Sequence, residues 1–307
     1  MSGDAGGGNR DRQQAIAALL TAHVGRPVEV DGLRAYGGAC INDAVRVSST
    51  AGSFFAKWSE AGSRRQLEVE AIGLRALRAA AGDELVVPEV IGVTSPPDPP
   101  ILVLEHLDPP PRGDDAAQDA ALGAALAQIH AHTAERFGRL GEEHDSPGAE
   151  PATPAAEPDW VSHYRDSYML PLLRRIAAER PLPEEVAGLH RRLCERLPAV
   201  LGSGEEADRP ALVHGDLWHG NYMRTARGPA LIDPHAAYAH REYEFGIATL
   251  FGGFGRQFWD AYQSVAPLAP RWQERNALYQ WYHLLNHHRL FCGSYGAAAE
   301  ATARRFL

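Results

Sequence analysis

The sequence predicts an α+β fold of two lobes: a small N-lobe with an antiparallel sheet plus a helix, and a larger, mainly helical C-lobe. Strand-like apolar runs bounded by glycine or proline turns dominate residues 28–104. Helical periodicity prevails from residue 115 onward. Between these parts, residues 108–115 carry three prolines and form the natural boundary. We therefore expect a flexible tail over 1–10, an N-lobe over 11–107 and a C-lobe over 108–307.

Composition narrows the possible functions and locations. The chain has 307 residues, 45% of them hydrophobic and 22% charged, as in ordinary globular proteins. Its net charge of −9 argues against a nucleic-acid partner. The three cysteines stand far apart and form no CxxC pair, so a reducing compartment is the simpler interpretation. With no 18-residue apolar run and no apolar leader, the prediction is a cytoplasmic protein without a membrane partner.

The first lobe is expected to open with a helix and a glycine-containing hairpin. Residues 11–24 place Ile16, Leu19 and Leu20 on one side of a helix, and Gly25 ends it. Strands over 28–36 and 44–47 enclose a turn with two glycines. Such a turn lets backbone N–H groups approach phosphates, although a glycine pair in a hairpin is more often only a turn. The turn residues are Gly37, Gly38, Ala39, Cys40, Ile41 and Asn42.

A lysine and a glutamate follow on the next two elements. The strand over 53–58 carries Lys57, and the helix over 63–81 carries Glu70 beside its apolar stripe. Lys57 is by default an exposed strand lysine, and Glu70 a boundary carboxylate. Alternatively, Glu70 reaches Lys57 and holds it against the phosphates of a nucleotide. The order of glycine hairpin, strand lysine and helix glutamate is that of a kinase N-lobe.

The end of the first lobe is expected to be a hinge. Strands over 90–93 and 101–104 precede Glu105, His106 and Leu107. Backbone groups in such a hinge can hydrogen-bond the edge of adenine, so the identity of the side chains matters little there.

The second lobe shows a succession of helical patterns around an irregular centre. The expected helices cover 115–133, 159–180 with an interruption at Pro171, 184–201, 258–262, 272–291 and 297–306. Residues 142–158 are predicted to be a surface loop. His283 and His287 have the i, i+4 spacing of zinc ligands, but the glutamate of HExxH is absent, so two core histidines are the better interpretation.

The stretch 212–234 contains the candidate catalytic and metal-binding residues. It places His214, Asp216 and Asn221 in the pattern H-x-D-x-x-x-x-N, followed by an apolar strand that ends at Asp233. In phosphoryl transfer of the protein-kinase class, the first Asp orients the attacking hydroxyl and accepts its proton. The Asn and the second Asp hold Mg²⁺, which prefers hard oxygen ligands and needs few from the protein. For each residue alone, ordinary turn chemistry is the competing explanation.

The chain resembles the fructosamine kinase family, also called ketosamine-3-kinases, from about Tyr36 to the C-terminus. The segments that carry the resemblance are GGACIND at 37–43, FFAKW at 54–58, EAIGLRAL at 70–77, LVLEHL at 102–107, LVHGDLWHGN at 212–221, LIDPHAAYAHREYE at 231–244, LFGGF at 250–254 and LYQWYHLLNHHRLF at 278–291. The resemblance implies a protein-kinase-like fold and an ATP-dependent enzyme that phosphorylates the 3-hydroxyl of a ketosamine such as a fructosamine or ribulosamine adduct. The phosphorylated adduct then becomes unstable and frees the amine, which is a deglycation repair.

The resemblance also implies roles for single residues. Asp216 becomes the catalytic base, Asn221 and Asp233 the Mg²⁺ ligands, and Lys57 with Glu70 the contact to the phosphates of ATP. The 37–42 loop covers those phosphates, and residues 105–107 hold the adenine. Candidate acceptor contacts are Trp218, His219, His240 and Glu242. The chain departs from the family pattern at Ala39, His219, His235 and Glu244, and the last three are expected near the acceptor pocket.

Two other functions compete with this one. A kinase of the same fold could act on an aminoglycoside or amino-alcohol, and a pseudokinase could bind nucleotide as a regulator. The intact set of motif residues argues against a pseudokinase. The sequence leaves open the sugar and amine of the acceptor, whether it is free or protein-bound, and the oligomeric state.

Cys40 has two interpretations. It is either a small residue that fills the turn or a redox-sensitive thiol whose thiolate is favoured by backbone N–H donors and Lys57. Cys194 and Cys292 fall in helical patterns and are expected to be less reactive.

Overall fold

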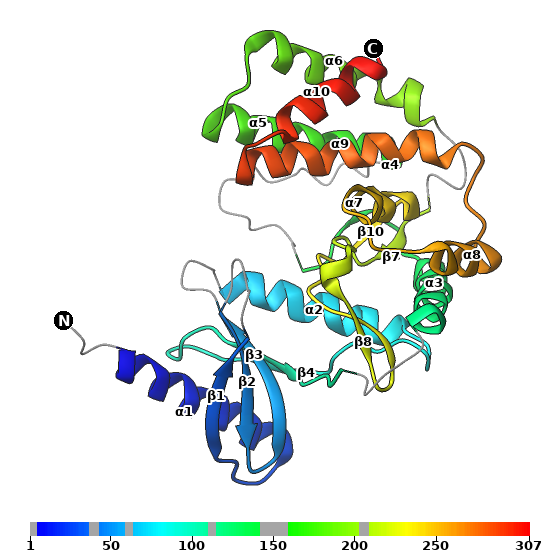
Figure 1. Cartoon of the computed structure of the whole chain (residues 1–307). Coiled ribbons are helices and arrows are strands. Elements are labelled where there is room, and N and C mark those ends of the chain that lie inside the picture. The colour runs from blue at the N-terminus through cyan, green and yellow to red at the C-terminus, as the bar shows by residue number, and fades with distance from the viewer. Residues whose placement is uncertain (1–4, 37–42, 59–63, 110–114, 142–158, 203–208) are drawn as a thin grey trace.

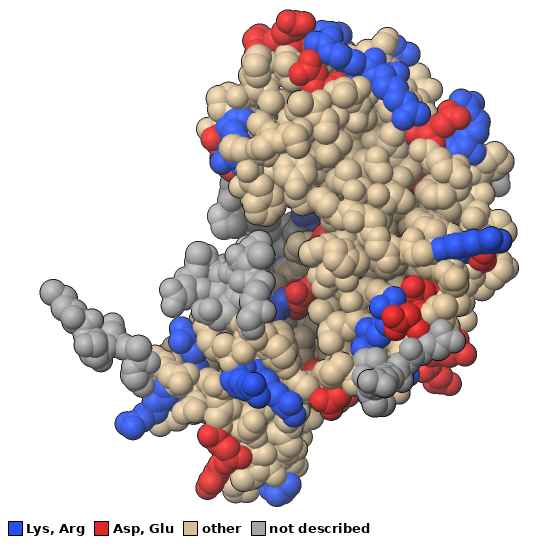
Figure 2. Space-filling model, in the orientation of Figure 1, with Lys and Arg blue, Asp and Glu red and all other residues tan. Residues whose placement is uncertain are grey.

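The computed structural model describes residues 5–36, 43–58, 64–109, 115–141, 159–202 and 209–307. A five-stranded sheet with two helices forms the N-terminal part, and helices dominate the rest (Figure 1). In the space-filling view the molecule is hollowed between the two parts, with charged side chains of both signs inside the hollow (Figure 2). The glycine-rich turn at 37–42 and the loop at 142–158 lie outside the described residues.

The N-terminal sheet is antiparallel throughout, as predicted. Its order is β1-β2-β3-β5-β4, with β1 (Val30–Ala35), β2 (Asp43–Ser49), β3 (Gly52–Trp58), β4 (Val90–Val93) and β5 (Leu102–Glu105). Because side chains alternate along a strand, those of β3 pack into two different hydrophobic clusters, one on each face of the sheet. Ala56 and Trp58 pack in the cluster that includes Ile16 and Leu20 of the first helix, while Phe55 packs in the cluster on the opposite face. Lys57 shares the face of Phe55.

The first helix, α1 (Ala5–Val24), begins six residues before the predicted start at Asp11. The prediction of a flexible tail over 1–10 was therefore wrong for residues 5–10, which form the first turns of α1, whereas residues 1–4 lie outside the described part. Three glycines discourage a helix, but each residue added to an existing helix gains a backbone hydrogen bond. The turns that bury Ile16 and Leu20 anchor the helix, and it extends from them toward the N-terminus.

The second helix, α2 (Arg64–Ala80), covers the other face of the sheet with the predicted apolar stripe. Leu67, Ala71, Leu74 and Leu77 are buried there in one cluster with Leu102 and Leu104 of β5. This packing fixes the helix against the strand that pairs with β3 and so sets the distance between Glu70 and Lys57.

The C-terminal part consists of eight helices and several short elements among the described residues. The helices are α3 (Asp115–Ala131), α4 (Trp160–His163), α5 (Leu170–Glu179), α6 (Glu184–Leu201), α7 (Glu244–Leu250), α8 (Arg256–Val265), α9 (Trp272–Phe291) and α10 (Tyr295–Arg305). One small sheet has the order β6-β10-β7, with β6 (Gly138–Arg139), β10 (Ala237–Ala239) and β7 (Ala211–Val213); the hairpin of β8 (Tyr222–Thr225) and β9 (Gly228–Leu231) forms another. No described helix combines the length and the apolar character that crossing a membrane requires.

The predicted interruption near Pro171 takes the form of a widened turn. A π-helical segment, Tyr164–Met169, joins α4 to α5, and the Leu170 N–H donates to the carbonyl of Arg165, five residues back. Pro171 follows in the first turn of α5. Proline lacks the N–H that would continue the ladder of backbone hydrogen bonds, and the widened turn lies directly before it. The chain therefore stays helical across this region instead of breaking.

A backbone connection joins the two parts next to the catalytic stretch. Val86, which follows α2, forms a parallel bridge with Ala230 of β9. The Val86 N–H donates to the Pro229 carbonyl at 2.8 Å, and the Leu231 N–H donates to the Val86 carbonyl at 3.0 Å. The strand that leads to Asp233 is thus fixed to the N-terminal part.

Candidate active site

The three polar residues of the catalytic stretch converge, although up to 17 positions separate them in the sequence. β7 leads into Asp216, the short 3₁₀ turn η2 (His219–Asn221) presents Asn221, and Asp233 follows β9. The Asn221 Nδ2 lies 2.9 Å from the Asp216 Oδ2, 2.9 Å from the Asp216 carbonyl oxygen and 3.4 Å from the Asp233 carbonyl oxygen. The motif therefore forms one cluster of oxygen-rich side chains.

Lys57 connects this cluster to the N-terminal part. Its Nζ lies 2.6 Å from the Glu70 Oε2 and 2.7 Å from the Asp233 Oδ1, and the residue is 5% exposed. Burial works to lower the pKa of Lys57, but the two carboxylates together raise that pKa above its ordinary value. Burial raises the pKa of Glu70 to about 7, against the attraction of Lys57. The strand lysine is thus a fixed cation between the two lobes.

Asp233 has an unusual backbone. Its φ is 53°, in the left-handed region, where aspartate is among the few non-glycine residues seen with some frequency. Such outliers are retained where the surrounding structure enforces them, often at functional sites. The conformation turns the chain directly after β9, so the carboxylate meets Lys57 while the Asp233 carbonyl lies near Asn221.

The donor atoms suit a hard divalent cation. Carboxylate and amide oxygens are ligands that Mg²⁺ accepts, and Mg²⁺ typically takes one or two carboxylates and completes its shell with water and substrate phosphates. Within the described part of the chain, no group of three or more His, Cys, Asp or Glu side chains is arranged to hold a metal. A cation here would accordingly be shared between Asn221, Asp233 and phosphate oxygens. His283 is buried, and half-buried His287 donates to its carbonyl.

Asp216 has a carboxyl suited to proton transfer near neutral pH. Burial raises its pKa to about 7; the hydrogen bond from Asn221 opposes this shift, and the negative charges of Glu244 and Asp233 add to it. A general base works best when its pKa lies near the operating pH.

His214, by contrast, is a structural group. Its Nε2–H donates to the Ile232 carbonyl at 2.9 Å, and its Nδ1 accepts the Asp216 N–H at 3.3 Å. Burial lowers the pKa of His214, so the ring is neutral in this tautomer. It joins the backbone of Asp216 to the residue before Asp233.

Glu244 lies beneath the catalytic loop. Its buried carboxylate accepts the backbone N–H groups of His214 and Gly215, the latter at 3.0 Å. Its Oε2 is 3.7 Å from the Nε2 of buried His130. Gly215 permits this arrangement, because its φ is 80° and a Cβ there would meet the His235 carbonyl oxygen at 2.1 Å. No sequence pattern indicated this role, since the partners of Glu244 are main-chain groups 29 and 30 residues away.

We expect Glu244→Gln to lower kcat by about 10- to 100-fold, which corresponds to losing about 1.5–3 kcal/mol from a charged hydrogen-bond acceptor. An amide can accept one of the two N–H groups but turns its own donors toward the other. The KM for ATP should change little, because Glu244 does not contact Lys57 or Asp233 in the structure. Steady-state kinetics measure this, and a kcat within twofold of wild type would remove the positioning role.

Two of the predicted hinge residues, Glu105 and His106, have side-chain contacts of their own, and the Glu105 N–H already donates to the Glu89 carbonyl at 2.9 Å. The Glu105 carboxylate pairs with Arg227 at 2.7 Å and with Arg78 at 3.6 Å, and it accepts the Glu89 N–H at 3.1 Å. The His106 Nε2 is 2.6 Å from the Tyr36 hydroxyl, and its Nδ1 is 3.3 Å from Asp108. Recognition of adenine by the backbone of residues 105–107 stays a prediction.

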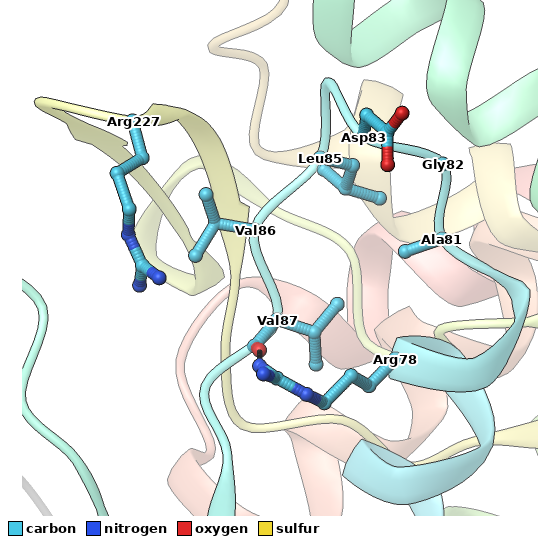
Figure 3. Close-up of a pocket in the computed structure, with 8 residues that line it drawn as sticks. All are labelled: Arg78, Ala81, Gly82, Asp83, Leu85, Val86, Val87 and Arg227. Atoms are coloured by element: carbon cyan, nitrogen blue, oxygen red, sulfur yellow. Dashed lines mark hydrogen bonds between the residues drawn. The ribbon is translucent and has the colours of Figure 1, made fainter.

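A pocket lies between α2, the segment after it and the β8–β9 turn. Arg78 and Arg227 stand on opposite sides of Val86 and Val87 in it (Figure 3). None of the predicted site residues lines this pocket. Because the Glu105 carboxylate contacts both arginines, we assign the group a structural role that joins α2, the hinge and the β8–β9 turn.

Of the four acceptor candidates, two are buried and have other partners. The Glu242 carboxylate is 2% exposed and binds Arg275 through both oxygens, at 2.6 and 2.8 Å. The His240 Nδ1 is 3.0 Å from the Tyr279 hydroxyl, and burial lowers the pKa of this histidine to about 3. The prediction that these side chains contact the acceptor was wrong, because η3 (Arg241–Tyr243) and its flanks turn them toward α9.

The other two candidates remain on the surface of the catalytic loop. The Trp218 ring lies against Gly220, where a Cβ would come within 2.4 Å of it, and against the His219 ring at a centroid distance of 5.0 Å. His219 is exposed and packs against Gly253, at which a Cβ would lie 2.4 Å from the His219 Cβ. Gly253 of the LFGGF segment therefore lets that loop approach the catalytic loop closely.

The buried ion pair between Glu242 and Arg275 can be tested by its effect on stability. Glu242→Ala leaves Arg275 without its carboxylate, and breaking a buried ion pair from one side costs about 3–5 kcal/mol. We expect the free energy of unfolding to fall by about that amount in urea denaturation. Glu274→Ala, which breaks an exposed pair with Arg271 beside the same helix, is the matched control and should change stability little. Equal effects of the two substitutions would contradict the structural role of Glu242.

The two described cysteines, Cys194 and Cys292, differ in their exposure to solvent. Cys194 is buried, and burial raises the pKa of its thiol to about 12, in line with the expected low reactivity. Cys292 lies just past the end of α9, exposed, with a φ of 62° and the Arg180 guanidinium against its sulfur. The prediction placed Cys292 in a helical pattern, whereas the structure places its thiol in the open, after the helix has ended. Cys40 lies outside the described residues.

Known proteins are similar to this chain in sequence over most of its length. A family model described as fructosamine kinase matches residues 12–307. A probable ketoamine kinase from Synechocystis is 32% identical over 301 residues, which cover 96% of each chain. The ketosamine-3-kinase of Mus musculus is 31% identical over 283 residues, 84% of this chain and 89% of the mouse protein.

Solved structures agree in architecture. A Thermobifida fusca protein provisionally named fructosamine-3-kinase superposes with a TM-score of 0.77 at 32% identity, covering 95% of this chain and 98% of its own. An aminoglycoside phosphotransferase, solved with AMP-PNP and hygromycin B, has a TM-score of 0.62 at 13% identity, covering 95% and 97%. The second likeness shows the fold alone, and the predicted protein-kinase-like fold is confirmed.

Proposed function

The chain belongs to the fructosamine kinase family, and from this membership we propose that it transfers a phosphoryl group from ATP to the 3-hydroxyl of a ketosamine. The observation that carries the proposal is the single cluster of Asp216, Asn221, Asp233, Lys57 and Glu70, joined by contacts of 2.6–3.4 Å. Relatives named ketoamine kinase, ketosamine-3-kinase and protein-ribulosamine 3-kinase support the acceptor class.

In this proposal, each residue has a definite task. Asp216 orients the acceptor hydroxyl and takes its proton at a carboxylate oxygen. Lys57, positioned by Glu70, contacts the phosphates of ATP, and backbone groups of residues 105–107 hold the adenine. Asn221 and Asp233 hold Mg²⁺, which neutralises charge on the phosphates when bound. The predicted contact of residues 37–42 with the phosphates stays a prediction, since these residues lie outside the described part of the chain.

The acceptor has an amine attached to a sugar chain, and phosphorylation at its 3-hydroxyl makes the adduct unstable. The product then loses the sugar fragment and frees the amine, so the activity would repair glycated amines. Names among the relatives include protein-bound ribulosamine as an acceptor, so both free and protein-bound ketosamines are candidate substrates here. We keep the predicted cytoplasmic location as part of the proposal, although relatives with chloroplastic names show that location varies within the family.

A turnover assay tests this function against its competitors. Purified protein is supplied with ATP and Mg²⁺ and, in separate reactions, with N-substituted fructosamines, ribulosamines, aminoglycosides and choline. We expect ADP release only with ketosamines. Turnover confined to aminoglycosides or choline would assign another acceptor class, and nucleotide binding without any turnover would indicate a pseudokinase.

A further inference from the structure

Five neighbouring rings, four half-buried and one exposed, form a chain that starts at the catalytic loop, and we call it the aromatic strip: Trp218, Phe251, His287, Phe291 and Tyr295. The centroid of Trp218 lies 6.3 Å from that of Phe251, and Phe251 lies 4.8 Å from His287. His287 in turn lies 5.5 Å from Phe291 and 5.2 Å from Tyr295. The strip therefore runs from the catalytic loop, over the end of α7, to the adjoining ends of α9 and α10.

The two ends of the strip differ in a way that indicates a ligand. Trp218 is two residues from Asp216, whereas Phe291 at the other end is 58% exposed. A single exposed apolar side chain needs no explanation. A chain of touching rings that leads from a catalytic group to an exposed phenyl group is an apolar track, and contiguous apolar surface of this kind marks interaction sites.

The strip is uncharged. The His287 Nδ1–H donates to the His283 carbonyl at 2.8 Å, which leaves Nε2 as an acceptor. Burial lowers the pKa of His287, so the imidazole is neutral at neutral pH. The remaining four members are Trp, Phe and Tyr rings. The surface thus suits an apolar or aromatic group better than a polycation such as an aminoglycoside.

The covalent structure of a ketosamine determines which part of the acceptor would reach the strip. The amine nitrogen is bonded to C1, and the reacting hydroxyl to C3, so only C2 separates the two substituted carbons. With the hydroxyl at Asp216, the substituent on nitrogen must leave the site within a few bonds of the catalytic loop. In the proposed function ATP binds on the N-lobe side, next to Lys57, whereas the strip begins on the C-lobe side.

We propose that the aromatic strip is the subsite for the amine-side substituent of the ketosamine and that it favours apolar or aromatic amines. This proposal rests on the ketosamine kinase function. Trp218 lies next to the sugar, and Phe251 and Phe291 form the parts of the surface that discriminate between substituents.

Two acceptors with the same sugar test it: N-(6-phenylhexyl)-fructosamine, whose hexyl chain lets the phenyl group extend along the strip toward Phe291, and N-methyl-fructosamine. We expect the wild-type kcat/KM to favour the phenylhexyl acceptor about three- to tenfold, the range that stacking between aromatic rings provides. Phe291→Ala should lower this ratio toward one, and Phe291→Tyr should keep it. Leu290→Ala removes an adjacent side chain that is 45% exposed and outside the strip, so it serves as the matched control and should leave the ratio unchanged. Because position 291 is exposed, these substitutions should fold, and thermal unfolding checks this.

The possible outcomes distinguish failure of the proposed subsite from failure of the proposed kinase function. Turnover of both acceptors at equal kcat/KM, or an unchanged ratio in Phe291→Ala, would overturn the subsite while the kinase function stands. A ratio lowered as much by Leu290→Ala would also overturn it. If neither acceptor is phosphorylated, the proposed function fails, and the subsite falls with it.

Discussion

Asp216→Asn is expected to lower kcat by about 10²–10⁴-fold, the usual contribution of a positioned general base. Asparagine has nearly the same shape but cannot accept the proton of the acceptor hydroxyl. The affinity for ATP should change little, because Lys57, Glu70 and Asp233 are still in place to contact the nucleotide. Rapid-quench kinetics and calorimetric ATP titration measure the two quantities separately. Retention of more than about a tenth of the wild-type kcat, a loss far below this range, would show that Asp216 is not the base.

The same substitution carries its own control for folding. Burial raises the pKa of Asp216 to about 7, so the folded state disfavours the charged carboxylate. Between the unfolded pKa and about 7, the folded state binds more protons than the unfolded state, so this group lowers stability as the pH rises. In metal-free protein at pH 8, the Asp216→Asn variant carries a neutral amide in place of the carboxylate and should therefore unfold at an equal or higher temperature than wild type. A lower midpoint would point to a folding defect instead of lost chemistry.

Asp233→Ala is expected to weaken Mg²⁺-dependent ATP binding by at least about tenfold, the lower end of the effect of removing groups that support a metal site. The carboxylate offsets the charge of the cation, and it also fixes Lys57 at 2.7 Å. Asn221→Ala should have the same direction but a smaller size, since an amide carries no charge. The measurement is a Mg²⁺ titration at fixed ATP concentration.

Lys57→Met separates the two roles of Asp233. Without the lysine, the metal requirement should persist while ATP affinity falls, because the metal ligands are unchanged. If Asp233→Ala and Asn221→Ala both show the wild-type requirement for Mg²⁺, the assignment of these residues as metal ligands is wrong.

The order of the elements and the pairing of Lys57 with Glu70 could be predicted from the sequence. Both rest on local periodicity: alternation puts Lys57 on the face of Phe55, and the helical stripe of α2 puts Glu70 near the same face. The H-x-D-x-x-x-x-N motif likewise determined which side chains the catalytic loop presents, because neighbours in a tight turn have few ways to be arranged. The acceptor class followed from residue patterns along most of the chain.

Tertiary structure decided the roles that depend on packing between distant segments. His240 and Glu242 lie in a short irregular run with no periodicity, so only contact with α9 determines that they face inward. Glu244 binds backbone N–H groups, which nearly every residue has, and no side-chain pattern could identify its partners. The contact of Lys57 with Asp233 spans 176 positions and exists because the Val86–Ala230 bridge holds the two parts together. Neighbouring residues in the sequence determine the local chemistry of the catalytic loop. The direction in which an irregular segment faces is determined by the elements that pack against it.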